Sequence, residues 1–125
     1  MNWKEIKYKY VGAWIEFISN NDFLEINEDK NSPRFGTLGW YFTDGVHKVK
    51  MWHIYESRNL YDFFDENGFY VDAYMGNYLD NWRYFTWTIH TCDGLIASDE
   101  VRFTVRTAAE ESAFTKAFEL LEERL

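Results

Sequence analysis

The sequence predicts a single α+β domain, with a mostly antiparallel sheet of five or six strands, a helix at each end of the chain and a short inserted helix. Three observations support this class. Apolar residues recur at helical spacing near both ends of the chain, whereas the middle alternates apolar and polar residues as strands do. The length of 125 residues corresponds to one domain. A content of 46% hydrophobic and 21% aromatic residues excludes disorder and supplies a core.

The N-terminal segment is predicted to be a helix that ends near Asn20. Asn2 is suited to cap the first turn, and Glu5 lies three residues later, as in a capping box. A short strand over 23–26 and a polar loop over 27–34 follow the helix. The apolar stripe of the helix consists of Ile6, Tyr10, Trp14 and Phe17, widened by Val11, Ile15 and Ile18.

A hairpin is predicted where two strand-like segments, 38–43 and 46–52, flank the pair Asp44-Gly45. Asp-Gly readily adopts positive φ at both central positions of a two-residue type I′ turn, and such a turn determines the strand register. The pairs expected from it are Thr43 with Val46, Phe42 with His47, Trp40 with Val49 and Leu38 with Met51.

The central part of the chain is predicted to form a short helix over 57–67 and then two strands. Asn67-Gly68 is suited to end the helix, whose buried side is marked by Leu60, Phe63 and Phe64. The strands cover 69–75 and 84–90, each with an apolar and a polar face. The apolar positions are Phe69, Val71, Ala73 and Met75 in the first strand, and Phe85, Trp87 and Ile89 in the second.

A second Asp-Gly pair, Asp93-Gly94, presents a register conflict. A two-residue turn there would place Phe85 opposite Arg102, so that apolar residues of one strand would face charged residues of the next. We therefore expect a longer, irregular loop over 93–99 and a following strand. The apolar set of that strand is Val101, Phe103 and Val105.

The C-terminal segment is predicted to be a long helix. Thr107 and Glu110 have the spacing of a capping box, which would start the helix after Thr107. Its apolar stripe consists of Phe114, Ala117, Phe118, Leu121 and Leu125, whereas Glu110, Glu111, Glu119, Glu122 and Glu123 lie largely outside it.

No complete catalytic, cofactor-binding or metal-binding motif is recognised in the sequence. His53 and Glu56 have a metal-like spacing but follow a strand, where they would point to opposite faces. His90 and Cys92 share a strand face but lack a third group to orient them, and the neighbouring Asp93 disfavours a thiolate. We therefore expect no catalytic residue, no cofactor and no metal.

The formal net charge of −8, the single cysteine and the lack of a long apolar run point to a cytoplasmic protein that does not enter a membrane. An acidic chain is not attracted to nucleic acid, and direct nucleic-acid binding is not expected. The acidity is compatible with a basic protein partner, although many cytoplasmic proteins are acidic for solubility alone.

The candidate partner-binding residues are tyrosines on the polar side of predicted strands together with nearby carboxylates. They are Tyr70, Tyr74, Tyr84, Asp62, Asp65, Glu66 and Asp72. The preferred function is non-enzymatic binding of a protein, as by an inhibitor or an immunity-like factor. Two alternatives remain: a small-ligand-binding module that uses aromatic stacking, and an enzyme whose site has no recognisable motif. The oligomeric state is not predicted.

Two stretches of the sequence carry a resemblance to other proteins. The run 106–125, RTAAEESAFTKAFELLEERL, and the run 58–71, RNLYDFFDENGFYV, together resemble small uncharacterised proteins of phage, prophage or mobile-element origin. The resemblance covers about a third of the chain and transfers no functional residue. It implies a small accessory protein, such as a phage accessory factor, that acts by binding.

Overall fold

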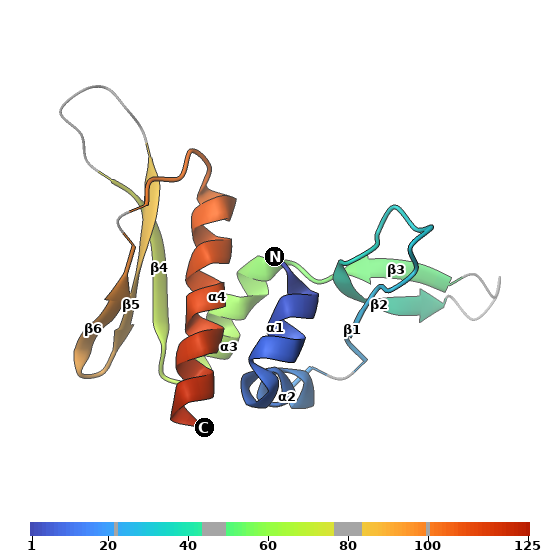
Figure 1. The fold of residues 1–125 in the computed structure, drawn as a ribbon, viewed down its shortest axis with the longest axis horizontal. Coiled ribbons are helices and arrows are strands. Elements are labelled where there is room, and N and C mark those ends of the chain that lie inside the picture. The colour runs from blue at the N-terminus through green and yellow to red at the C-terminus, as the bar shows by residue number, and fades with distance from the viewer. Residues whose placement is uncertain (22, 44–49, 77–83, 100) are drawn as a thin grey trace. The chain divides into compact units, whose positions relative to one another are not determined.

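The computed structural model describes residues 1–21, 23–43, 50–76, 84–99 and 101–125. The chain groups into two compact units, residues 1–56 with Leu125, and residues 57–124. The protein is α+β, as predicted, but it has two separate three-stranded antiparallel sheets (Figure 1). The predicted single sheet of five or six strands is therefore not matched. The single domain stays a prediction, and we describe the two units separately.

The first unit contains two helices and one sheet, whose strand order is β1-β2-β3. Its elements are α1 (Trp3–Lys9), α2 (Val11–Ser19), β1 (Glu25–Ile26), β2 (Leu38–Thr43) and β3 (Lys50–Ile54).

The predicted N-terminal helix is present but divided at Tyr10, whose φ of −118° and ψ of 63° are not helical. The Asn2 cap is confirmed, because its Oδ1 accepts a hydrogen bond from the Glu5 backbone N–H at 3.1 Å. The predicted stripe is partly correct. Its four main members, Ile6, Tyr10, Trp14 and Phe17, are buried, whereas Val11 and Ile15 are exposed.

The strands of the first hairpin pair in a different register from the predicted one. Thr43 pairs with Lys50 and Phe42 with Met51, so the expected pairs of Thr43 with Val46 and Leu38 with Met51 are wrong. Trp40 pairs with His53 instead of Val49. Asp44-Gly45, Val46, His47 and Val49 lie outside the described residues. The shift along β3 is four residues, an even number, so it changes the partners without exchanging the two faces of β2.

The second unit contains a sheet of order β4-β5-β6, and α4 packs against β4 and β5 (Figure 1). Its elements are η1 (Ser57–Asn59), α3 (Leu60–Glu66), β4 (Tyr70–Met75), β5 (Phe85–Thr91), β6 (Gly94–Ser98) and α4 (Arg106–Arg124). The predicted inserted helix corresponds to η1 and α3. Gly68 follows it with a φ of 81°, the left-handed conformation expected after a helix. The most deeply buried side chains include Leu60, Phe64, Ile89, Phe114, Phe118 and Leu121.

Strands β5 and β6 are joined by a tight turn, whereas a longer, irregular loop was expected there. Thr91 pairs with Gly94, so the two central residues are Cys92 and Asp93, and residues 95–98 lie in a strand rather than in the expected irregular loop. The register then changes at a bulge between Ile89 and His90.

Further along the chain, in yet another register, Phe85 and Phe103 form an isolated bridge. The apolar match that the sequence argument required is therefore achieved at Phe103. The strand expected to follow is reduced to this bridge, and the other two members of its predicted apolar set, Val101 and Val105, are exposed.

Helix α4 begins two residues earlier than expected, at Arg106, so Thr107 lies in the first turn and the predicted capping box is wrong. The Ala109 N–H donates to the Val105 carbonyl at 3.4 Å, and Glu110 accepts a hydrogen bond from a tyrosine on α3 instead of serving as a cap. The predicted buried stripe is confirmed from Phe114 to Leu121, but Leu125 is exposed.

Candidate partner-binding surface

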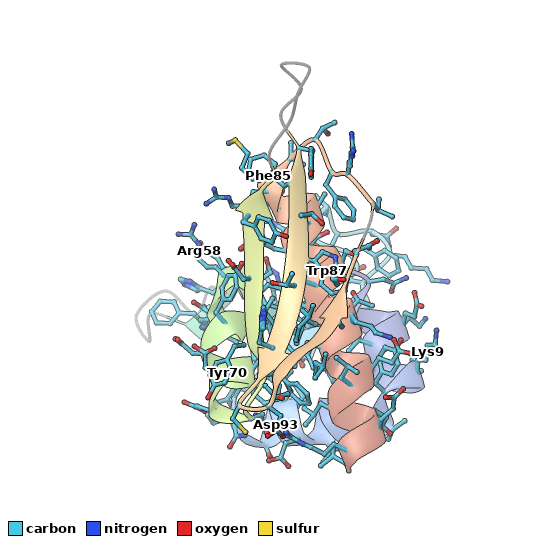
Figure 2. The ribbon with its side chains drawn as sticks, turned by 90° about the vertical axis from the view of Figure 1, so that its left-hand side faces the viewer. Lys9, Arg58, Tyr70, Phe85, Trp87 and Asp93 are labelled. Atoms are coloured by element: carbon cyan, nitrogen blue, oxygen red, sulfur yellow. The ribbon has the colours of Figure 1, made fainter. Side chains whose placement is uncertain are left out.

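The sheet of the second unit has an inner face toward α4 and an outer face. Val71, Trp87 and Ile89 are buried on the inner face, and the Trp87 indole N–H donates to Ser112 Oγ of α4 at 3.1 Å. Strand alternation places the intervening residues on the opposite side of the sheet. Figure 2 shows this side, with α4 behind the strands and Tyr70 near the start of β4.

Three of the predicted residues form a row along the outer face of β4. Tyr70, Asp72 and Tyr74 alternate with inner-face residues, and all three are exposed. Their cross-strand partners on β5, which share the outer face, are His90, Thr88 and Thr86. The alternation read from the sequence therefore placed Tyr70, Asp72 and Tyr74 correctly.

Tyr84 joins the same row because Gly76, which directly follows β4 and takes the next position on the outer face, has no side chain. The Gly76 N–H donates to the Tyr84 carbonyl at 3.0 Å, which continues the pairing of β4 and β5. The Tyr84 ring occupies the space that a Cβ at Gly76 would need, so the ring lies across the end of β4. The structure thus brings the three predicted tyrosines onto one face.

An arginine of the same unit lies on this row. The Arg102 guanidinium carbon is 4.8 Å from the centre of the Tyr84 ring, within the range of a cation–π interaction. Sequence reasoning missed both Arg102 and Gly76. The position of Gly76 could have been used for prediction. It lies two residues after Tyr74, so alternation places it on the outer face, and a glycine there indicates that another group approaches the strand closely.

The three predicted carboxylates of α3 lie on the solvent side of that helix. Asp62, Asp65 and Glu66 are exposed, whereas Phe63 and Phe64 between them are buried. Their spacing of three and four residues places them on one helical face. Within the part of the chain that the structure describes, no hydrogen bond joins these three side chains to the tyrosine row, and all three add negative charge to the same unit.

Tyr61 connects α3 to the rest of the unit. Its hydroxyl donates a hydrogen bond of 2.6 Å to Glu110 Oε2 on α4, and its ring packs edge-on against Phe114. Burial raises the pKa of Tyr61 well above its usual range. The hydrogen bond to Glu110 and the negative charges of Glu110 and Asp72 raise this pKa further, while Arg106 lowers it.

We expect the contribution of Tyr61 to stability to depend on alkaline pH. Unfolded tyrosine ionises near pH 10, whereas folded Tyr61 keeps its proton to higher pH. This contribution is therefore complete below about pH 10 and decreases as the pH rises above it. Tyr61→Phe should lower the free energy of unfolding by about 1 kcal/mol near pH 8. The difference from wild type should shrink toward about pH 11.

Urea unfolding of both proteins across this pH range tests the prediction of a shrinking difference. Glu110→Gln is the matched control, because it keeps an acceptor for the Tyr61 hydroxyl but removes the negative charge. Its pH dependence should lie between those of wild type and Tyr61→Phe. A difference between wild type and Tyr61→Phe that stays constant with pH would contradict the assignment.

Negative charge is concentrated in the second unit. Residues 57–124 contain 13 Asp and Glu and six Lys and Arg, a net charge of −7, whereas residues 1–56 contain eight Asp and Glu and seven Lys and Arg, a net charge of −1. All seven predicted partner-binding residues belong to the acidic part of the chain. A positively charged molecule approaching the protein would therefore be attracted chiefly to this part.

Of the histidines considered from the sequence, His90 lies on this outer face, opposite Tyr70. His53 lies in the first unit, stacked parallel to Trp40 with ring centres 6.0 Å apart, and Cys92 is exposed in the β5–β6 turn. Within the described ranges, no three His, Cys, Asp or Glu side chains are grouped so that they could hold a metal ion. None of the described helices is both long and apolar enough to cross a membrane.

Comparisons of the chain with protein-family models, with curated protein sequences and with solved structures give no match.

Proposed function

We propose that the protein acts without catalysis by binding a basic protein partner through the outer face of the second sheet and the adjacent carboxylates of α3. The observation that carries the proposal is the assembly of Tyr70, Asp72, Tyr74 and Tyr84 on one face, within the unit that holds a net charge of −7. Exposed tyrosines supply large rigid contact areas with a polar tip, as protein interfaces commonly use.

The charges and the rings have different roles in this proposal. Exposed carboxylates accelerate the encounter with a basic partner but add little affinity, since solvent and salt screen them. The tyrosine rings lose accessible surface in the complex and therefore slow its dissociation. Removing charge should thus change the association rate, whereas removing a ring should change the dissociation rate.

Selection of random-sequence peptides against the immobilised protein tests the proposal. The selected peptides should be enriched in Arg and Lys, and their association should slow when the salt concentration rises above about 0.15 M. The triple variant Asp62→Asn, Asp65→Asn, Glu66→Gln should slow association by roughly threefold or more, because it removes exposed charge from α3. Tyr74→Ala should accelerate dissociation by about two- to fivefold.

The matched control is the pair Glu28→Gln and Asp29→Asn, which removes two exposed carboxylates from the first unit. This variant should associate with the selected peptides at nearly the wild-type rate. Enrichment of uncharged or acidic peptides would contradict the proposal, and so would association that is indifferent to both salt and the α3 charges.

A further inference from the structure

We propose that the row Tyr70–Asp72–Tyr74 is a binding site for one arginine side chain of the partner, with the guanidinium over the Asp72 carboxylate and against a tyrosine ring. This inference rests on the proposed function and names the side chain that the surface recognises. It follows from the spacing of the row, from an arginine already placed on the same face, and from the charge of the unit.

The spacing of the row suits a single planar cation. Residues two apart on a strand are separated by about 7 Å along it, so each tyrosine is one such step from Asp72. Tyr70 is 48% exposed and Tyr74 is 40% exposed, which leaves much of each ring accessible. A cation is attracted to a ring within about 6 Å of its centre. A guanidinium over Asp72 can therefore reach the carboxylate and a neighbouring ring together.

The chain itself provides an example of this contact one position further along the row. Arg102 places its guanidinium 4.8 Å from the ring centre of Tyr84, and that ring lies over Gly76, the outer-face position after Tyr74. The outer face of β4 thus carries an arginine–tyrosine pair at one end. Because Arg102 already occupies the Tyr84 ring, we assign the partner's arginine to Asp72, which lies between Tyr70 and Tyr74.

Arginine fits this site better than lysine. A guanidinium is planar, stacks on an aromatic ring and offers parallel N–H donors that match both oxygens of a carboxylate. The ammonium group of lysine is a compact, strongly hydrated charge that makes neither contact as well. A second copy of this chain is an unfavourable occupant, because it would bring a second net charge of −8 toward an acidic surface.

Short peptides provide the probes for a direct test. We would titrate the ¹⁵N-labelled protein with Ac-Gly-Gly-Arg-Gly-Gly-NH₂ and follow the backbone amide signals by NMR. Two further peptides carry lysine, or citrulline, which has the shape of arginine without its charge. The arginine peptide should shift signals of β4 and β5 at residues 70–76 and 84–90. The lysine peptide should bind about two- to fivefold more weakly, and the citrulline peptide should show no measurable binding.

Variants assign the binding to particular side chains. Asp72→Asn and Tyr74→Ala should each weaken binding of the arginine peptide by about two- to fivefold. Their matched controls are Asp62→Asn, an exposed acid on α3, and Tyr8→Ala, an exposed tyrosine on α1, which should bind as wild type. The same spectra report whether each variant is folded.

The possible outcomes separate this inference from the proposed function. If selected basic peptides bind but Asp72→Asn and Tyr74→Ala leave the arginine peptide unaffected, the arginine site is wrong and the basic partner stands. If the citrulline peptide binds as well as the arginine peptide, the arginine site is also wrong. If no basic peptide binds in either experiment, both proposals fail.

Discussion

Phe118→Ala should lower the free energy of unfolding of the second unit by about 3–5 kcal/mol. Phe118 is fully buried, at 0% exposure, in the middle of α4. Its ring centre lies 5.0 Å from that of Phe64, in an edge-on arrangement, and 6.1 Å from that of Phe63. Removing the ring removes the free energy gained by burying it and the contacts with Phe63 and Phe64. It also leaves a cavity that the surrounding rings cannot fill without moving.

The measurement is urea unfolding of Phe118→Ala and wild type, combined with hydrogen exchange of the α4 amides. Val101→Ala is a suitable control, because Val101 is 55% exposed and its loss should change stability by less than about 0.5 kcal/mol. A loss below about 1 kcal/mol in Phe118→Ala would show that α4 does not close this core. Exchange that is faster throughout α4 would locate the effect in the helix itself.

The success of the sequence in identifying Phe118 reflects the local nature of helical periodicity. Phe114, Ala117, Phe118 and Leu121 share one helical face whatever packs against it, so spacing alone identifies the face of the helix that is buried. The break at Tyr10 shows the limit of this reasoning. Its dihedral angles are not helical, and no glycine or proline occupies that position to indicate it.

Strand pairing was predicted less well because it depends on residues far apart in the chain. In the first hairpin, alternation groups Leu38, Trp40 and Phe42 on one face of β2, but Phe42 is exposed and the strand partners were four residues away from those expected. In the second hairpin, the buried residues Trp87 and Ile89 were placed correctly on the apolar face. The register change occurs at a bulge beside Ile89, however, and not in the irregular loop that was expected over 93–99. The separation into two sheets similarly reflects which strands meet in space, and no local pattern specifies it.

In the candidate surface too, some residues could be placed from local spacing and others only from the tertiary structure. Alternation along β4 was enough to place Tyr70, Asp72 and Tyr74 on one exposed face. The addition of Tyr84 depends on the pairing of β4 with β5 and on the missing side chain at Gly76. The contact of Arg102 with Tyr84 depends further on the path of the chain after β6. Residue type and spacing therefore identified the components, whereas their assembly required tertiary structure.

Gly39→Ala should destabilise the first unit by about 1–3 kcal/mol or more, although alanine is the smallest possible addition. Gly39 lies in β2 opposite Ile54, and a Cβ there would collide with the backbone carbonyl of His53 and lie 2.9 Å from the Trp52 ring. The Trp52 indole N–H donates to Thr37 Oγ1 at 3.0 Å, which holds the ring over the glycine. Because the nearest obstacle is backbone, relief requires β2 and β3 to move apart and disturbs their hydrogen bonds.

A second glycine of the same unit separates this crowding from the general cost of replacing glycine. Gly36 has a φ of 81° and open space where a Cβ would project, and asparagine tolerates this left-handed conformation. Gly36→Asn should therefore cost less than about 1 kcal/mol, in contrast to Gly39→Ala. Urea unfolding followed by hydrogen exchange of the β2 and β3 amides measures both variants. Equal losses would mean that contact with Trp52 and the His53 carbonyl does not govern Gly39. A larger loss at Gly39, with exchange accelerated in β3, would show that the pairing of β2 with β3 requires a residue without a side chain at this position, where the His53 carbonyl and the Trp52 ring lie too close for a Cβ.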